Sequence, residues 1–528
     1  MSDLLAAPGA STLYEAFQTI AQRSPAAEAI LAGDIRITYG ELAELVERCA
    51  AALRQRGVRH GDRVGILSPP RPEVLIVLLS CARLGAIYLG LGPRLSPSEL
   101  EYVMADANPA VVFVMREIQG RNYERDVAEL CRHAAIEVCP MTWSDDRLSH
   151  EFSAFLHCDS RDSHSAAPAA MAPRGAAQPG DGLAIIYTSG TTGPPKGALI
   201  SHRGIISAVS GVLARLRLSR FHALATLPID HVAFLTSEAV MVILTGGSVV
   251  QLPKFDPSAV LEAMERRRTT VWFAIPTMLQ RLVGSQRIHE YDLSSLELIW
   301  WAGPVPQHVV DVLRSKSRYL GVSYGMTETS GGITVSDPDI DPERLLTTVG
   351  RPHQNIEVRL RGDPPAHGDL PREILVRGPQ LMTGYWKKPE QTAQAFVDGW
   401  FQTGDLGILR DGFLSILGRE KELIRSGGYN ISPTEVENVL AAHPGVAFVV
   451  VLGVSDPEYG EAVHAVWSSH PETDVSDQDL KRHVRERLAG YKVPKRFWRW
   501  SELPFLANGK LDRRELRSRI QSELSSTA

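Results

Sequence analysis

The stretch Tyr187-Thr188-Ser189-Gly190-Thr191-Thr192-Gly193-Pro194-Pro195-Lys196-Gly197 lies between two apolar runs, at residues 183–186 and 198–200. It combines three glycines, four small hydroxyl side chains and one lysine. Glycines let a backbone approach a ligand closely, and N–H groups, hydroxyls and a cation together suit a polyphosphate. The spacing is not that of a Walker A loop, and a plain surface turn is the alternative interpretation. We expect a nucleotide-phosphate loop between two buried strands.

Composition sets the broad class of the protein. The chain has 528 residues, of which 44% are hydrophobic and 22% charged, as is typical of a globular protein with two or more domains. Its formal charge of −5 is spread without long blocks, which argues against a nucleic-acid partner. The five cysteines show neither disulfide nor zinc spacing, which favours a reducing compartment. Because no signal peptide and no long apolar window are present, we predict a cytoplasmic protein without a membrane span.

Helical and strand patterns alternate over most of the chain, for example a helix at 72–84 and a strand at 110–114. This alternation predicts an α/β fold with a largely parallel sheet. From about residue 355 the pattern changes to short strands and tight turns, and a compact α+β unit follows. We therefore predict a large N-terminal α/β domain with a distorted barrel-like portion at 1–420, and a small α+β domain at 421–528.

A second motif, Ser323-Tyr324-Gly325-Met326-Thr327-Glu328-Thr329-Ser330-Gly331-Gly332, places one carboxylate among hydroxyls and glycines. Beside a phosphate loop, Glu328 is suited to hold Mg²⁺ through its oxygens. Tyr324 is suited to stack on a nucleotide base. The alternative is that the Thr and Glu residues here serve as a helix cap.

Asp411-Gly412 is a strong signal for a hairpin with a two-residue loop. If residue 410 pairs with 413, Asp405 falls opposite Gly418 and beside Arg419. The functional interpretation is a carboxylate that binds a ribose diol, with the arginine near the same nucleotide. The alternative is a simple surface ion pair, which contributes little.

Together these segments resemble the adenylate-forming superfamily of acyl- and aryl-CoA synthetases, peptide-synthetase adenylation domains and luciferases. The resemblance runs from about residue 12 to 517 and rests on six motifs in the family's order: 187–197, 227–232, 324–328, 400–405, 418–435 and 508–510. It implies an ATP-dependent acid–thiol ligase that forms an acyl-adenylate and pyrophosphate, then transfers the acyl group to coenzyme A and releases AMP. The small C-terminal domain is expected to rotate between the two steps.

The resemblance also assigns roles to individual residues. In catalysis it places Lys510 between the acyl carboxylate and the α-phosphate, although a lysine on a turn such as 508–510 is ordinarily just solvated. It also implies catalytic roles for Thr327 at the α-phosphate, Glu328 as the ligand of Mg²⁺, and His231 as the gate of the CoA tunnel. The other residues expected to bind ATP are Thr188, Ser189, Gly190, Thr191, Thr192, Gly193, Lys196, Tyr324, Gly325, Asp405 and Arg419.

Two further regions follow from the resemblance. The CoA tunnel is expected to include Ser426, Gly427 and Gly428 next to His231, with the domain hinge at Lys421. The acyl pocket is expected to be lined by Val232, Ala233, Phe234, Ser237, Trp301, Ala302, Gly303, Met326, Gly331 and Ile333. This apolar lining with a large ring favours an aromatic, alicyclic or medium-chain carboxylic acid. Asp230 departs from the family pattern, and either recognises a polar group or accepts a hydrogen bond.

Two other functions are kept open. A free-standing enzyme that loads an acyl group onto a carrier-protein phosphopantetheine has the same adenylation half. A non-catalytic nucleotide-binding relative belongs to another class. In the leading interpretation the partners are a small carboxylic acid, ATP and CoA, with Mg²⁺ as cofactor, and the protein acts as a monomer or homodimer.

Overall fold

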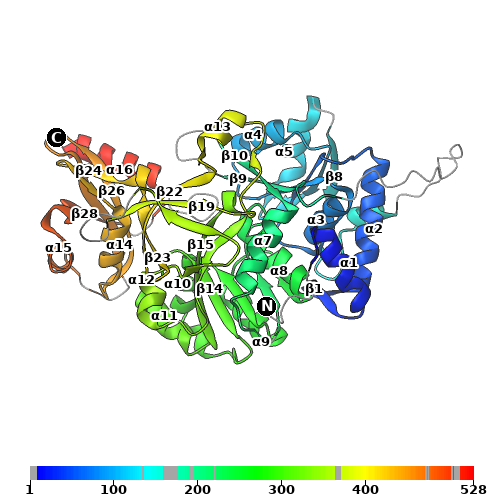
Figure 1. Cartoon of the computed structure of the whole chain (residues 1–528), viewed down its shortest axis with the longest axis horizontal. Coiled ribbons are helices and arrows are strands. Elements are labelled where there is room, and N and C mark those ends of the chain that lie inside the picture. Colours follow the sequence, from blue (N-terminus) through cyan, green and yellow to red (C-terminus); the bar gives the residue numbers. More distant parts are fainter. Residues whose placement is uncertain are drawn as a thin grey trace, which may run out of the picture.

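The computed structural model describes residues 7, 9–133, 136–157, 177–188, 194–218, 220–362, 370–469, 473, 475–500, 503–504 and 512–527. Among the described residues, three large sheets, one two-stranded hairpin and most of the helices form the larger part of the molecule (Figure 1). The C-terminal residues form a smaller part at one end, coloured orange and red.

The first large sheet is parallel through its centre and antiparallel at its edges. Among the described residues its strands follow the order β17 (Arg351–Pro352), β16 (Gly331–Val335), β15 (Tyr319–Met326), β14 (Leu298–Ala302), β13 (Val271–Ala274), β11 (His222–Ala225), β12 (Ser248–Gln251), β1 (Glu28–Ala32) and β2 (Ile35–Thr38). The carboxyl ends of its central strands lead into the segments that carry several predicted site residues.

The second large sheet carries the phosphate-loop hairpin at one side. Its described strands follow the order β20 (Gly384–Tyr385), β10 (Lys196–Ser201), β9 (Gly182–Thr188), β4 (Ile87–Leu91), β3 (Arg63–Leu67), β5 (Val111–Met115) and β8 (Glu137–Met141). A separate small hairpin joins β6 (Glu117–Ile118) and β7 (Arg121–Asn122).

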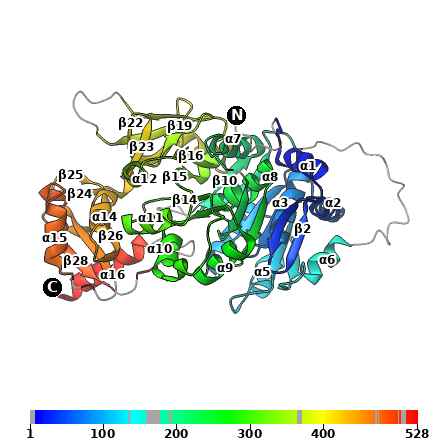
Figure 2. The same cartoon turned by 90° about the horizontal axis from the view of Figure 1, so that it is seen from below.

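Helices surround and separate these two sheets (Figure 2). They are α1 (Leu13–Arg23), α2 (Tyr39–Gln55), α3 (Pro72–Leu84), α4 (Pro97–Ala107), α5 (Tyr123–Leu130), α6 (His150–Leu156), α7 (His202–Leu213), α8 (Met241–Thr245), α9 (Pro257–Arg267), α10 (Pro276–Gly284), α11 (Gln307–Arg314), α12 (Pro342–Thr347) and α13 (Pro389–Gln394). Helix α3 contacts β1 of one sheet and both β3 and β4 of the other. It is apolar on nearly every face, which is the pattern of a helix buried on all sides.

A third, antiparallel sheet follows in the chain. It is formed by β18 (Glu357–Leu360), β19 (Arg372–Arg377), β21 (Phe396–Val397), β22 (Trp400–Arg410) and β23 (Phe413–Arg419). The predicted hairpin joins β22 to β23, and its two loop residues, Asp411 and Gly412, have φ angles of 52° and 80°. Two positive φ angles define the type I′ turn that the Asp-Gly pair favours.

The C-terminal part has its own sheet and its own apolar core. The strands are β24 (Ile424–Ser426), β25 (Tyr429–Ile431), β26 (Val446–Asp456), β27 (Gly460–Ser469) and β28 (Arg496–Arg499), and the helices are α14 (Pro433–Ala441), α15 (Asp477–Arg485) and α16 (Arg513–Thr527). Helix α16 packs on β26 through Leu516 and Ile520. The whole arrangement confirms the predicted α/β class with a smaller strand-rich C-terminal part.

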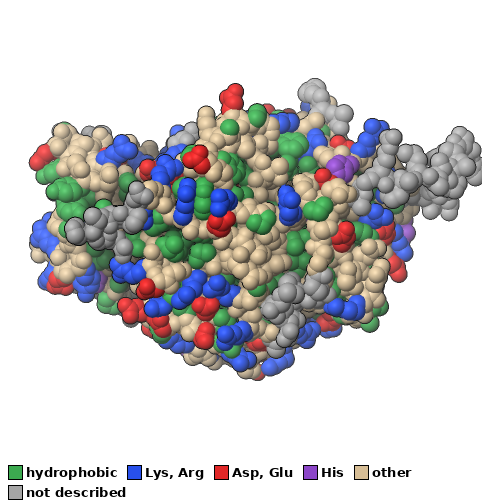
Figure 3. Space-filling model, in the orientation of Figure 1, with side chains coloured by type: hydrophobic (Ala, Val, Ile, Leu, Met, Phe, Trp, Pro, Cys, Tyr) green, Lys and Arg blue, Asp and Glu red, His purple; other side chains and the backbone are tan. Residues whose placement is uncertain are grey.

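The surface carries charges of both signs. On the face shown in Figure 3, Lys and Arg side chains lie among Asp and Glu side chains rather than in one separate patch. None of the helices in the described part of the chain is both long and apolar enough to cross a membrane.

Candidate active site

The phosphate-loop motif forms the hairpin between β9 and β10. Thr188 pairs with Lys196 across the two strands, and the Thr188 hydroxyl donates to the Lys196 carbonyl oxygen at 3.4 Å. The half-buried Lys196 ammonium lies 4.9 Å from the centre of the Tyr385 ring on β20. The loop tip, with the predicted contacts Ser189, Gly190, Thr191, Thr192 and Gly193, lies outside the described residues.

Tyr385 connects this lysine to the predicted metal ligand. Its hydroxyl donates to Glu328 Oε1 at 2.9 Å, and the backbone N–H of Met382 donates to the Glu328 carbonyl oxygen at 2.8 Å. Burial and the nearby carboxylate raise the pKa of Tyr385, so the hydroxyl stays protonated and remains a donor. Lys196 and Glu328, predicted from separate motifs, therefore meet at one tyrosine.

The surroundings of Glu328 fit a magnesium ion better than a protein-caged metal. Among the described residues, no group of three or more His, Cys, Asp and Glu side chains could hold a metal ion. Mg²⁺ commonly binds through one or two carboxylates together with substrate phosphates and water. A single carboxylate beside a phosphate loop matches that pattern.

Three predicted nucleotide contacts come together on the hairpin of β22 and β23. Arg419 Nε donates to Asp405 Oδ1 at 3.0 Å, and the Tyr324 hydroxyl donates to Asp405 Oδ2 at 2.6 Å. The Asp405 side chain is 6% exposed, whereas that of Arg419 is 50% exposed. Burial raises the pKa of the Asp405 carboxyl, while Arg419 and Tyr324 hold it down. The carboxylate is thus fixed in place, and the guanidinium is open to a ligand.

The predicted register of this hairpin was wrong by one residue. Asp405 pairs with Arg419 rather than with Gly418, because a β-bulge between Leu406 and Gly407 shifts the ladder. A bulge places one extra residue in one strand and turns the following side chains. Here the shift brings the carboxylate and the guanidinium directly opposite each other.

The segment after β15 forms a tight turn around Thr327. Thr327 is buried at the start of a short 3₁₀ turn, Thr327–Thr329. Gly325 is exposed, and a Cβ there would lie 2.0 Å from the Gly331 carbonyl oxygen. Only glycine allows this close approach. Ser330 continues the turn with a φ of 52°.

The predicted acyl-pocket residues come from two places that meet. Val232, Ala233, Phe234 and Ser237 are buried at a π-helical segment, Phe234–Val240. Such segments are frequent at functional sites. A Cβ on Gly331 would lie 2.6 Å from the Thr236 methyl carbon, so this segment touches the start of β16.

The other predicted pocket residues lie at the ends of β14 and β15 and in β16. Trp301 and Ile333 are buried, Ala302 and Met326 are half-buried, and Gly303 has a φ of 101°. Trp300, the neighbour of Trp301, packs edge-on against Phe273 with ring centres 5.4 Å apart. Both tryptophans are buried, at 3% and 1% exposure.

His231 and Asp230 lie between the acyl segment and β4. His231 Nδ1 accepts a hydrogen bond from the Ala233 backbone N–H at 3.1 Å. Asp230 points toward Gly92, where an added Cβ would lie 2.2 Å from its Oδ2. Burial raises the pKa of the Asp230 carboxyl.

The residues predicted for the CoA tunnel and the hinge lie at the start of the C-terminal part. Ser426 is buried, whereas Gly427 and Gly428 are exposed, with φ angles of 57° and 84°. Lys421 is exposed in a 3₁₀ turn, Glu420–Glu422. Lys510 lies outside the described residues.

Comparison with known proteins places this site in a family. Residues 17–386 match the family model of the AMP-binding enzyme, and residues 435–510 match that of the AMP-binding enzyme C-terminal domain. The chain belongs to the AMP-binding enzyme family.

Curated relatives match this AMP-binding enzyme over nearly its whole length. It is 36% identical to a feruloyl-CoA synthase of an Amycolatopsis species over 506 residues, which cover 95% of the chain and 97% of the relative. It is 35% identical to an indoleacetate–CoA ligase of Aromatoleum aromaticum over 501 residues, 92% of the chain and 93% of the relative. These relatives are CoA ligases, which confirms the prediction of an ATP-dependent acid–thiol ligase.

A solved structure of the same architecture is the o-succinylbenzoate CoA synthetase from Bacillus subtilis in complex with its acyl-adenylate intermediate. The TM-score is 0.77 at 29% sequence identity, covering 95% of this chain and 97% of that one. The predicted adenylate-forming superfamily and its fold are thereby confirmed.

Two residues of this AMP-binding enzyme that support the site had no role in the sequence-based hypothesis. Tyr385 was visible only as part of a short strand, and nothing in its neighbours indicates that it reaches Glu328. Glu238 is 1% exposed and accepts hydrogen bonds from the backbone N–H groups of Thr226 and Leu227 at 2.8 and 3.2 Å. A lone carboxylate within the apolar run 232–244 was the available signal for it.

Proposed function

We propose that this AMP-binding enzyme activates an aromatic carboxylic acid with ATP and transfers the acyl group to coenzyme A. The observation that carries the proposal is the convergence of four separate motifs, at 187–197, 324–328, 400–405 and 418–435. Lys196 and Glu328 meet at Tyr385, and Asp405 binds both Tyr324 and Arg419. A phosphate site and a ribose site on one nucleotide account for both groups of contacts.

In the first step, a carboxylate oxygen of the acid attacks the α-phosphorus of ATP. The bond between the α-phosphorus and its bridging oxygen breaks, and pyrophosphate leaves with that electron pair. We propose that Lys196 binds the pyrophosphate end, that Thr327 donates to the α-phosphate, and that Lys510 bridges the acid and the phosphate. Cations and donors fixed where charge develops are the main source of such catalysis.

Magnesium would be held by Glu328 and would neutralise charge on the phosphates. Tyr385 orients this carboxylate, because its hydroxyl is bound to one of the two oxygens. Asp405 and Arg419 would hold the ribose, and Tyr324 would lie beside adenine while it also fixes Asp405. These residues position the nucleotide and take no part in bond changes.

In the second step, the thiol sulfur of CoA attacks the acyl carbon, AMP departs, and the thiol proton is lost. We propose that the exposed Gly427 and Gly428 leave room for the pantetheine arm, and that His231 gates its path. We also propose a domain boundary between residues 420 and 421, with Lys421 as the hinge. This rotation is a conformational step of the kind that limits many enzymes.

The acid is proposed to be aromatic on two grounds. Most of the predicted pocket lining is buried and apolar, and it includes Trp301 at the end of β14. The relatives named above are a feruloyl-CoA synthase and an indoleacetate–CoA ligase. Size selection in such pockets is modest, about 1–3 kcal/mol per methylene, so several related acids are expected to react.

A pyrophosphate-release screen over a panel of carboxylic acids tests the substrate class. The panel contains hydroxycinnamic, arylacetic, alicyclic, medium-chain and short-chain acids, each with ATP, Mg²⁺ and CoA. We expect the highest kcat/KM for an aromatic acid. A preference for acetate or for a saturated chain would contradict the aromatic assignment while leaving the two-step chemistry intact.

The acyl acceptor needs its own test. With the best acid, AMP release is measured with free CoA and separately with a phosphopantetheinylated carrier protein. We expect discharge by CoA alone. AMP release with the carrier protein only would replace CoA ligation with carrier loading as the proposed function. No AMP release with either thiol would favour a non-catalytic nucleotide-binding relative.

A further inference from the structure

A cavity lies away from the residues assigned to ATP, the acyl group and CoA. It has a volume of about 140 Å³, and its walls follow the carboxyl ends of β1, β3, β8 and β12. Carboxyl ends of parallel strands are the usual ligand-binding edge of α/β proteins. Strands β14, β13 and β11 lie between β15 and β12, a separation of about 20 Å at ordinary strand spacing.

A buried side chain in this cavity has unused hydrogen-bonding capacity. Gln251, the last residue of β12, is 2% exposed. Among the described residues, neither its Nε2 nor its Oε1 has a hydrogen-bond partner. Nearly all buried polar groups in proteins are paired, so a carboxamide with both ends unpaired needs an explanation. The NH₂ group and the carbonyl oxygen of a carboxamide lie side by side. They can therefore pair with a ligand that presents an acceptor next to a donor.

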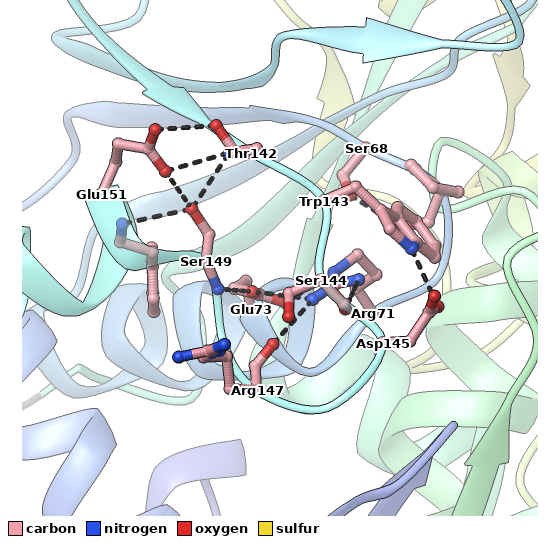
Figure 4. A network of polar contacts seen from close by, with 12 residues as sticks. Ser68, Arg71, Glu73, Thr142, Trp143, Ser144, Asp145, Arg147, Ser149 and Glu151 are labelled. Atoms are coloured by element: carbon pink, nitrogen blue, oxygen red, sulfur yellow. Dashed lines mark hydrogen bonds and ion pairs between the residues drawn. The ribbon is translucent and has the colours of Figure 1, made fainter.

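Arg71 forms another part of the cavity wall and is held in place by several hydrogen bonds. Arg71 donates to both oxygens of Glu73 and to the carbonyl oxygens of Ser144 and Arg147, so four of its five N–H groups are bound by the chain (Figure 4). Glu73 also accepts from the backbone N–H of Ser149 at 2.8 Å. This network fixes the loop between β8 and α6, which carries the next wall residue.

That residue is Trp143, which presents an indole ring at the cavity. Its Nε1 donates to Asp145 Oδ1 at 2.9 Å, and the Arg71 guanidinium covers the ring at 4.3 Å. The side chain is nevertheless 37% exposed. The indole of Trp143 is therefore fixed through its N–H and through one face, while part of its surface stays open. Such a ring is suited to stack on a flat ligand.

Two arginines at the end of α9 also line the cavity. Arg267 Nη2 donates to the Gly33 carbonyl oxygen at 2.7 Å, which anchors this side chain. Arg266 is exposed, and no ion pair of it occurs in the described part of the chain. Guanidinium groups bind phosphate strongly and with defined geometry.

We propose that this cavity is a second site for an adenine nucleotide, separate from the active site. A Gln carboxamide pairs with adenine in two hydrogen bonds, donating to N7 and accepting from the 6-amino group. Trp143 stacks on the base, as aromatic side chains do with nucleobases, and Arg266 binds the phosphate at the mouth. The proposal is independent of the reaction proposed above.

Equilibrium dialysis with labelled AMP tests the proposal on the full-length protein. We expect two AMP per chain for the wild type and one for Gln251→Leu. Leucine keeps the volume and removes the unpaired polar atoms, so this variant is expected to melt at the same or a higher temperature. Gln307→Leu, at an exposed glutamine on α11, is the matched control and keeps both sites.

Two further comparisons define the ligand. IMP carries the same phosphate and sugar but lacks the 6-amino donor, so we expect it to bind the second site about tenfold more weakly than AMP. Arg266→Ala is expected to weaken AMP there by a similar factor, whereas Arg268→Ala leaves it unchanged, because Arg268 faces Asp292 and Ser294 instead. Equal affinity for AMP and IMP would overturn the adenine assignment.

The active site is removed independently with Asp405→Ala. The Asp405→Ala variant is expected to bind one AMP per chain, at the proposed second site. The double variant Asp405→Ala/Gln251→Leu is expected to bind none. A single AMP per wild-type chain that Gln251→Leu does not affect would overturn the second site and leave the proposed function standing. Two AMP per chain in Asp405→Ala would instead contradict the ribose role of Asp405.

Discussion

Two arginine–carboxylate pairs in this chain have nearly the same geometry and opposite surroundings. Arg71 Nε lies 3.1 Å from Glu73 Oε2, and Arg419 Nε lies 3.0 Å from Asp405 Oδ1. In the first pair both side chains are buried, at 4% and 0% exposure. In the second pair the carboxylate is also buried, at 6% exposure, but half of the guanidinium surface is open.

The difference shows what each pair can do. Around Arg71 and Glu73 the backbone of 144–149 makes three further hydrogen bonds, so the pair mainly holds the chain together. Asp405 is fixed by Tyr324 and Arg419, and the exposed side of Arg419 faces outward. Exposure of the cation, rather than the distance across the pair, separates a structural clamp from a binding site.

The largest expected effect is on stability, from Glu73→Ala. This change leaves the Arg71 charge buried without its partner, and we expect the free energy of unfolding to fall by about 3–5 kcal/mol. Denaturant unfolding measures it. The control is Glu357→Ala, which breaks the exposed pair with Arg377 and is expected to leave stability nearly unchanged. An equal loss of unfolding free energy in the two variants would contradict the structural role of the buried pair.

The second effect is on catalysis, from Asp405→Asn. The amide keeps the shape of the side chain but loses the charge that binds Arg419 and the ribose, so we expect kcat/KM for ATP to fall about 100-fold, or ~2.7 kcal/mol. Steady-state kinetics at saturating acid measures it, and the melting temperature is expected to change little. Asp411→Asn, at the closed end of the same hairpin, is the control and should behave like the wild type, because Asn also suits a positive φ.

The third effect is a pH dependence that belongs to the same carboxylate. Burial raises the pKa of Asp405 above its ordinary 3.8, so kcat/KM for ATP should fall as the pH drops through that raised pKa, by about tenfold per pH unit below it. Stability has the opposite sign, because the folded state takes up this proton at a higher pH than the unfolded state. The contribution of Asp405 to stability therefore decreases as the pH rises from 3.8 through the raised pKa.

The pH–rate profile of Asp405→Asn is the check on this assignment. Without a titrating carboxyl at this position, the variant should lack the acid limb. An unchanged acid limb in the variant would assign it to another group.

The smallest effect is from Tyr324→Phe, which removes one hydrogen bond to Asp405 Oδ2. A single such bond contributes about 1 kcal/mol, so we expect KM for ATP to rise about fivefold with kcat nearly unchanged. The control is Tyr319→Phe at the other end of β15. A loss in Tyr324→Phe as large as that in Asp405→Asn would mean that the hydroxyl acts on the nucleotide itself.

Local patterns predicted the strands and the hairpin turn correctly, because these depend on residues close together in the sequence. The Asp411-Gly412 turn is an example, since its two positive φ angles follow from the residue types. The register beyond the turn did not follow, because a β-bulge opposite Leu406 and Gly407 inserts one extra residue, Leu417, into β23.

Long-range contacts were beyond prediction from one sequence. The bond from Tyr385 to Glu328 joins residues 57 positions apart, and neither segment carries a sign of the other. In the sequence Gln251 looks like an ordinary residue at the end of a strand. Only the folded arrangement of the strands shows that its carboxamide is buried without a partner. Lys510 and residues 189–193 keep their predicted roles as predictions.

The most direct test of the central claim is the product balance of the complete reaction. The enzyme is incubated with ATP, Mg²⁺, CoA and the best aromatic acid, and the products are quantified by chromatography and mass spectrometry. The account predicts AMP, pyrophosphate and the aryl-CoA in equal amounts, and none of them when the acid is omitted. Formation of ADP and phosphate, or of AMP without the thioester, would contradict it.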